Sequence, residues 1–172
     1  MELTQDVKER LAETTVFSDV EINKIYKRYK EIELPSGGLT KDQLSLIPEA
    51  ANNPFIQAAG RLYSKDDGVV GPDEFVRILN MFSERMDPKY KRKFLFHMFD
   101  VDENNYIDYE DVFRFYKMML SPAVSDERLT EITQFILSRS DLQQPGKLSF
   151  EDFTRLVSLK EVNRRMTLAL QI

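Results

Sequence analysis

Cysteine and tryptophan are absent from this chain of 172 residues, and histidine occurs once, as His97. Without cysteine the protein has no disulfide, no thiolate zinc site and no thiol nucleophile. A lone histidine in an amphipathic helix is typical of a partly exposed surface residue, because catalysis requires partner groups around it. The sequence shows no nucleophile paired with a base and no loop that would cradle a phosphate. We therefore predict that the protein is not an enzyme.

The chain also lacks an excess of basic residues and a long apolar run. Lysine and arginine number 24 against 29 aspartates and glutamates, a net charge of −5, which argues against nucleic acid as a partner. No apolar run approaches the ~20 residues of a membrane span, and the start MELTQDVKER lacks a signal peptide's apolar region. Glu2 stands where a myristoylation motif requires glycine. We expect a cytoplasmic protein with no myristoyl anchor and only indirect membrane contact.

Helical signals are present along most of the chain. In the segment SDVEINKIYKRYKEIE, Ser18 and Glu21 have the spacing of a capping box, and the apolar residues that follow recur at helical period. Pro54, Pro72 and Pro88 each precede an apolar-periodic segment, where the first turn of a helix accepts proline. Strand signals are few and short, so the pattern predicts a mainly helical protein.

One unit recurs four times along the chain, in GGLTKDQL, GVVGPDEF, NYIDYEDV and GKLSFEDF. Each copy has a leucine or β-branched residue, followed five positions later by an apolar residue that opens a helix. The first members are Leu39, Val70, Ile107 and Leu148, and the second are Leu44, Phe75, Val112 and Phe153. This pattern predicts four helix–loop–helix units, in which Leu39 pairs with Val70 and Ile107 with Leu148 as short strands.

The third loop is unusually rich in oxygen ligands. The stretch FDVDENNYIDYED, residues 99–111, places six acidic residues and two asparagines among thirteen positions. Its spacing satisfies the twelve-position calcium loop, in which alternate oxygens wrap one hard cation and neutralise carboxylates that otherwise repel each other. The alternative is a solvated acidic turn, since Asp and Asn are ordinary turn residues. The predicted ligands are Asp100, Asp102, Asn104, the Tyr106 carbonyl, Asp108 and Asp111.

Two positions depart from the usual loop. Position six, normally glycine because φ is positive there, is Asn105, the next most tolerant residue of that geometry. Position twelve is normally a bidentate glutamate, whereas Asp111 is one methylene shorter and offers fewer oxygens. Because fewer ligands favour the octahedral geometry of Mg²⁺, we predict one site that takes Ca²⁺ or Mg²⁺.

The other three loops have lost most of their anionic ligands. Residues 32–43 carry almost no carboxylate at the ligand positions, and in the second loop Tyr63 and Lys65 replace the first and third ligands. The fourth loop, residues 141–152, keeps only its terminal aspartates, Asp141 and Asp152. Few anionic ligands predict weak or absent cation binding, and a weak site in the fourth loop stays open.

Five segments are informative beyond the loops themselves: LSLIPEAANNPFIQ, LFHMFDVDENNYI, VFRFYKMML, KLSFEDFTRLV and EVNRRMTLAL. With loops that start at residues 32, 63, 100 and 141, they make residues 18–170 resemble the calcineurin B group of EF-hand proteins. This resemblance implies an all-α, calmodulin-like fold of four EF-hands in two paired lobes. The expected parts are an N-terminal arm at 1–17, a pair with degenerate loops at 18–84, a pair with one intact loop at 85–160, and a tail at 161–172.

The segment 112–120 predicts a helix that is apolar on two sides, and such a helix must be covered on both. Several methionines add flexible side chains of the kind found in grooves that accept a partner helix, although a generous core would explain them too. For a partner helix lying across both lobes, the predicted contacts are Phe82, Phe113, Met118 and Leu120.

The resemblance implies a regulatory protein that binds an amphipathic helix of a larger catalytic protein, with a serine/threonine phosphatase favoured. The alternative is a constitutive light chain or adaptor of the calcium- and integrin-binding or calcineurin-homologous type, with little response to calcium. In that case the bound helix belongs to a transporter, a receptor tail or a cytoskeletal protein.

Overall fold

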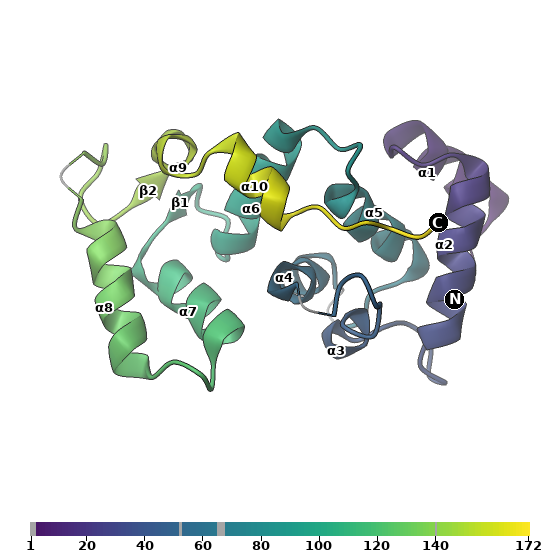
Figure 1. Ribbon diagram of the computed structural model, residues 1–172, viewed down its shortest axis with the longest axis horizontal. Helices are drawn as coiled ribbons and strands as arrows, with labels where there is room; N and C mark the ends of the chain where they lie inside the picture. Colours follow the sequence, from purple (N-terminus) through teal and green to yellow (C-terminus); the bar gives the residue numbers. More distant parts are fainter. Residues whose placement is uncertain (1–2, 52, 65–67, 140) are drawn as a thin grey trace. The chain divides into compact units, whose positions relative to one another are not determined.

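Figure 1 shows the computed structural model, which describes residues 3–51, 53–64, 68–139 and 141–172. The secondary structure is helical apart from very short strands, in agreement with the predicted all-α class. Among these residues, no helix combines the length and the apolar character needed to cross a membrane. The chain divides into two compact units, which are described separately: unit 1 is Met1–Asp87 with Asn163–Ile172, and unit 2 is Pro88–Val162.

The helices of unit 1 begin where the sequence predicts. The Ser18 side chain accepts a hydrogen bond from the Glu21 backbone, and the Glu21 carboxylate accepts one from the Ser18 backbone at 2.8 Å, which completes the capping box. Pro54 and Pro72 are the first residues of their helices, where a missing N–H costs nothing. The elements are α1 (Gln5–Thr14), α2 (Asp19–Ile32), α3 (Lys41–Leu44), α4 (Pro54–Tyr63) and α5 (Pro72–Phe82).

The two loops of unit 1 are joined by a short backbone pairing beside its core. The Leu39 N–H donates to the Val70 carbonyl at 2.9 Å and the Val70 N–H donates back at 2.8 Å, which confirms the predicted pairing. The rings of Tyr29 and Phe75 pack at a centroid distance of 5.6 Å beside this pair, and both side chains are buried. The Tyr29 hydroxyl donates to the Val70 carbonyl, so the buried phenol keeps a hydrogen-bond partner.

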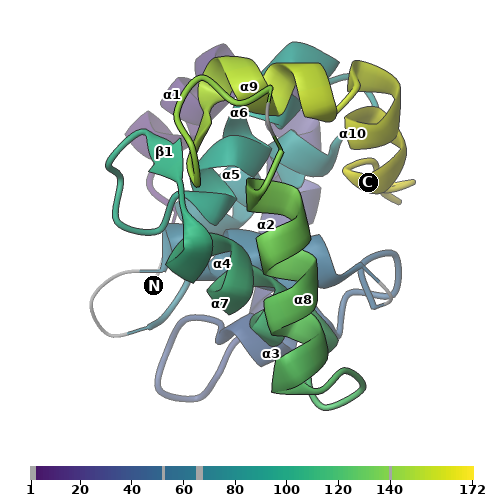
Figure 2. The same ribbon diagram turned by 90° about the vertical axis from the view of Figure 1, so that its left-hand side faces the viewer.

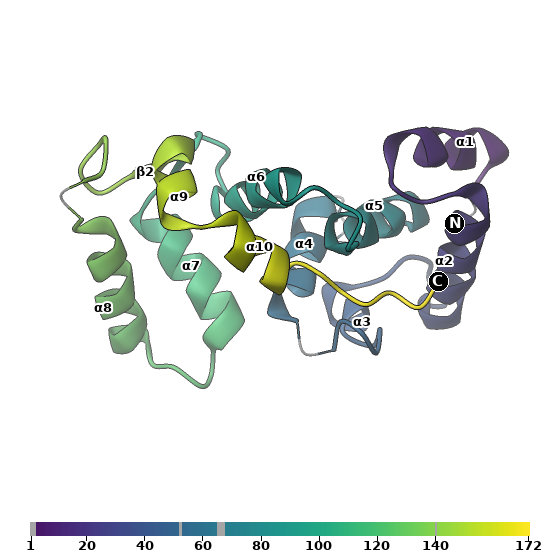
Figure 3. The same cartoon turned by 45° about the horizontal axis from the view of Figure 1, so that its top comes forward.

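Both ends of the chain belong to unit 1, which differs from the predicted boundaries. Helix α1 packs against α2 and α5, and Figure 3 shows it beside α2. The tail also joins this unit, because the Leu168 N–H donates to the Phe82 carbonyl at 2.8 Å and Met166 is fully buried. Residues 85–87 and 163–172 therefore lie with unit 1, since the contacts that place them connect residues far apart in the sequence.

Unit 2 contains the second pair of loops. Strands β1 and β2 are antiparallel, with Ile107 opposite Leu148 as predicted. Helices α7 and α8 lie side by side, as Figure 2 also shows. The elements are α6 (Pro88–Phe99), β1 (Tyr106–Ile107), α7 (Tyr109–Leu120), α8 (Asp126–Leu137), β2 (Leu148–Ser149) and α9 (Phe150–Leu156), with α10 (Leu159–Arg165) following along the chain.

Aromatic rings fill the core of unit 2. Phe99 stacks on Phe115 with ring centroids 3.7 Å apart, and Phe96 meets Phe153 edge to face at 5.5 Å. Phe115 and Phe153 are buried, while Phe99 is half-buried although it lies within this cluster. This core holds α6, α7 and α9 together and thereby fixes the helix ends from which the loop 100–111 emerges.

Candidate metal centre

The loop 100–111 connects α6 to α7 and brings three of the predicted ligands together. Carboxylate oxygens of Asp100, Asp102 and Asp111 lie within 4.8 Å of one another. Asp100 and Asp111 are buried, at 2% and 3% exposure, whereas Asp102 is exposed. These carboxylates belong to positions one, three and twelve of the loop, and together they offer the hard oxygen ligands that a divalent cation prefers.

Backbone N–H groups hold this loop in shape. The Asp100 carboxylate accepts hydrogen bonds from the backbone N–H groups of Asn104 and Asn105, each at 3.0 Å. Asn105 has φ of +67°, so position six adopts the left-handed conformation predicted for it. The turn therefore points the Asp100 carboxylate into the loop although glycine is missing.

The remaining predicted ligands have local roles. The Asn104 side chain donates to Asp102 at 2.7 Å. It also accepts, at 2.8 Å, from the backbone N–H of Tyr106, the first residue of β1. The Asp108 carboxylate caps α7 by accepting from the Glu110 N–H at 3.0 Å, and it lies outside the three-carboxylate cluster. This arrangement suits position nine, which often reaches a cation through water rather than directly.

Burial makes it costly to ionise the carboxylates at the two ends of the loop, Asp100 and Asp111. It raises the pKa of Asp100, against hydrogen bonds from the Asn105 and Asn104 backbone that lower it. Burial likewise raises the pKa of Asp111, against hydrogen bonds from Asp108 and Val101. A divalent cation would compensate both charges, because an opposite charge nearby favours the ionised form. The residues present therefore fit a hard cation that prefers oxygen ligands.

Replacing Asp111 by glutamate should shift the preference of this site towards calcium. The Asp111 carboxylate accepts from the Val101 and Asp108 N–H groups, each at 3.2 Å, which anchors it at the base of α7. A side chain longer by one methylene can present both oxygens, and Ca²⁺ takes more ligands than Mg²⁺. In competition titrations of Asp111→Glu, we expect the Ca²⁺/Mg²⁺ affinity ratio to rise at least about tenfold. An unchanged ratio would refute this role for the shortened ligand.

The described parts of the other loops differ from the loop 100–111 in the residues at ligand positions one and twelve or in the contacts of those residues. In the loop 32–43 the Gln43 side chain, at position twelve, donates to the Ile32 carbonyl at 2.7 Å. In the second loop Tyr63 is half-buried, and Lys65 lies outside the described residues. In the loop 141–152 the fully buried Asp152 is bonded to Arg155.

Sequence reasoning missed this arginine. The spacing of Asp152 and Arg155 along a helix is the signal that could have found it, because residues three apart are neighbours on a helix surface.

The predicted groove residues differ from one another in how deeply they are buried. Phe113, Met118 and Leu120 of α7 are half-buried, with apolar surface left exposed. Phe113 stacks on Tyr109 at a centroid distance of 6.0 Å. Phe82 is fully buried and its carbonyl is bonded to the tail, so in the free chain it is a core residue rather than a surface one. Of the predicted groove residues, those with exposed apolar surface therefore lie on α7, within unit 2.

Comparison with known proteins places this loop in a family. A model described as an EF-hand domain pair matches residues 89–158. The calcineurin B protein of Naegleria gruberi is 32% identical over 164 residues, which cover 94% of this chain and 93% of that protein. Its counterpart in Schizosaccharomyces pombe is 33% identical over 165 residues, 93% of each chain. The type 2 calcineurin B protein of Homo sapiens is 29% identical over 154 residues, 88% of this chain and 91% of that one.

The helix–loop–helix pair and its oxygen-rich loop define the class of calcium-binding EF-hand proteins. Within that class, this chain belongs to the calcineurin B-like family.

Proposed function

We propose that this protein is a regulatory subunit that binds Ca²⁺ or Mg²⁺ at one site and holds an amphipathic helix of a larger catalytic protein. The similarity to calcineurin B proteins along nearly the whole chain carries this proposal. It favours a calcineurin-type serine/threonine phosphatase as the catalytic protein. The role is non-enzymatic, and the proposed location is the cytoplasm.

The surface of α7 supports the choice of a helical partner. Phe113, Met118 and Leu120 leave apolar area exposed, whereas Val112 and Phe115 on the same helix are buried in the unit. Phe135 on the neighbouring α8 is 77% exposed, so unit 2 has a further exposed aromatic side chain. Burying such area stabilises a complex because apolar surface leaves water, and apolar grooves are a common way of binding amphipathic helices.

The proposed metal ligands are Asp100, Asp102, Asn104, the Tyr106 carbonyl, Asp108 and Asp111. Their loop leads directly into α7, since Asp108 caps this helix and Asp111 lies in its first turn. A cation that compensates Asp111 would therefore fix the start of the helix that presents the partner surface. Metal and partner binding are expected to support each other through this helix.

A constitutive adaptor is the second candidate, and the degenerate loops favour it. Hydrogen bonds within the protein connect the ends of the loops 32–43 and 141–152, so parts of both units are ordered by the chain's own donors. Such a protein would hold a helix of a transporter, a receptor tail or a cytoskeletal protein with little response to calcium.

Affinity purification from the native cell distinguishes the two candidates. The tagged chain should retain a phosphatase catalytic chain, identified by mass spectrometry, and Met118→Ala should weaken this retention while the bait stays folded. The exposed charge variant Arg128→Ala on α8 serves as a control, because it removes a surface pair with Glu131 of little energetic value. Recovery of other helical partners without any phosphatase, in EDTA and calcium alike, would support the adaptor instead.

A further inference from the structure

The loop 141–152 keeps the backbone of a cation-binding loop although its ligands are depleted. Gly146, at position six, has φ of +77°, and Leu148 pairs with Ile107 in the two-stranded ladder. Gln143 and Pro145 stand at positions three and five, where anionic or amide oxygens are usual. The loop therefore has the geometry of a metal site but lacks the charge for strong binding.

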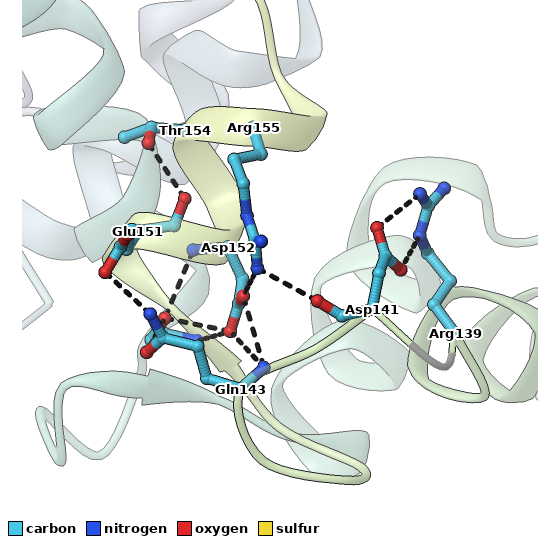
Figure 4. Close-up of polar contacts among 8 residues, drawn as sticks. Arg139, Asp141, Gln143, Glu151, Asp152, Thr154 and Arg155 are labelled. Atoms are coloured by element: carbon cyan, nitrogen blue, oxygen red, sulfur yellow. Dashed lines mark hydrogen bonds and ion pairs between the residues drawn. The ribbon is translucent and has the colours of Figure 1, made fainter.

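An arginine side chain connects the two ends of this loop, as Figure 4 shows. Arg155 Nη2 donates to Asp152 Oδ1 in an ion pair and to the backbone carbonyl of Asp141 at 3.0 Å. These two acceptors belong to positions twelve and one of the loop. The guanidinium thus connects the first and last positions of the loop, as a cation does in an EF-hand loop. It does so through the backbone carbonyl of Asp141, whose carboxylate pairs with Arg139.

Asp152 needs such a counter-charge because its side chain is fully buried. Burial by itself would raise the pKa of Asp152, but hydrogen bonds from Ser149 and Arg155 outweigh it and hold the pKa below its usual value. Ser149 Oγ donates to the carboxylate at 2.8 Å. The Gln143 N–H also donates to it, at 3.3 Å, as Figure 4 shows. The carboxylate is therefore kept charged by the protein's own donors.

We propose that the guanidinium of Arg155 is a built-in cation that replaces the metal ion of the loop 141–152 and excludes divalent cations from it. The loop is then ordered with or without metal, and the metal response of unit 2 comes from the loop 100–111 alone. The inference does not depend on the partner proposed above, since it concerns only contacts within unit 2.

The loop 100–111 shows what the arginine changes. There the carboxylates at positions one and twelve, Asp100 and Asp111, accept hydrogen bonds from backbone N–H groups. In the loop 141–152 the position-twelve carboxylate has a guanidinium partner and its pKa is lowered. The two loops therefore differ at the buried carboxylate of position twelve: Asp152 has a guanidinium partner, whereas Asp111 accepts from backbone N–H groups.

Removing the guanidinium should uncover a cation site. The test introduces Arg155→Met into a protein that already has Asp100→Ala, a change that removes cation binding by the loop 100–111. By calorimetry, the protein with Asp100→Ala alone should bind no Ca²⁺ at millimolar concentration. The double variant should bind one equivalent with a dissociation constant of about 10⁻⁴ to 10⁻³ M, typical of weak modules. Asp100→Ala with Arg128→Met is the matched control, because it removes an arginine from the same unit at an exposed pair. A folded double variant that binds no more Ca²⁺ than this control would overturn the proposal.

Hydrogen exchange of backbone N–H groups provides a second test, because it also reports on the loop 141–152 when Arg155 is present. In the Asp100→Ala protein, the backbone N–H groups of Gln143 and Ser149, which donate to Asp152, should be protected in EDTA and unchanged by calcium. In the double variant the same groups should exchange at least about tenfold faster in EDTA, and calcium should restore protection. Protection of the unaltered loop that appears only with calcium would show that a metal, and not Arg155, orders it.

Discussion

A calorimetric titration of the metal-free protein is expected to show one site of useful affinity, with Mg²⁺ competing effectively against Ca²⁺. Asp100→Ala should abolish this binding, because losing even a group outside the ligand shell typically costs about 10- to 100-fold in affinity. Asp100 is buried at the first position of the loop and its carboxylate belongs to the three-carboxylate cluster.

Glu110→Ala is the control for this titration. Glu110 lies in the same loop at a position that supplies no ligand, and its side chain is exposed. Its removal takes away the same charge, so a comparable loss of affinity would show that only the general negative field attracts the cation. Two or more strong calcium sites in the unaltered protein would contradict the assignment of a single site.

Truncating Phe153 and truncating Phe113 are expected to have opposite consequences. Phe153 is buried against Phe96 in unit 2, so Phe153→Ala should lower the free energy of unfolding by about 3 to 5 kcal/mol. Phe113 is half-buried on α7, so Phe113→Ala should leave folding nearly intact and weaken partner binding by about 1 to 4 kcal/mol. The paired measurement is thermal and denaturant unfolding of each variant beside its affinity for the captured partner helix.

Phe82→Ala should destabilise the fold as Phe153→Ala does, because Phe82 is fully buried in the free chain. Met118→Ala should weaken partner binding as Phe113→Ala does, with folding nearly intact. If Phe113→Ala and Met118→Ala destabilise the free protein as severely as Phe153→Ala, with partner affinity per folded molecule unchanged, then α7 offers no binding surface. The same experiment on Phe75→Ala provides a core reference within unit 1.

Local spacing alone determined several features of this protein. The capping box at Ser18 and the left-handed residue at Asn105 follow from rules that involve only a few neighbouring residues. The fourfold repeat also predicted that Leu39 pairs with Val70 and Ile107 with Leu148, since paired loops place the same position of each loop side by side. The clustering of Asp100, Asp102 and Asp111 belongs with these, because one loop contains all three residues.

Only the tertiary structure decided which apolar residues are covered and which charges are compensated. The burial of Phe82, with its carbonyl bonded to Leu168, combines segments that no periodicity connects. The bond from Arg155 to the Asp141 carbonyl spans fourteen positions and turns a depleted loop into a closed one. Helix caps and ligand spacing act within a few residues, whereas burial depends on which distant segment packs on a surface, and a pattern along the chain does not specify that.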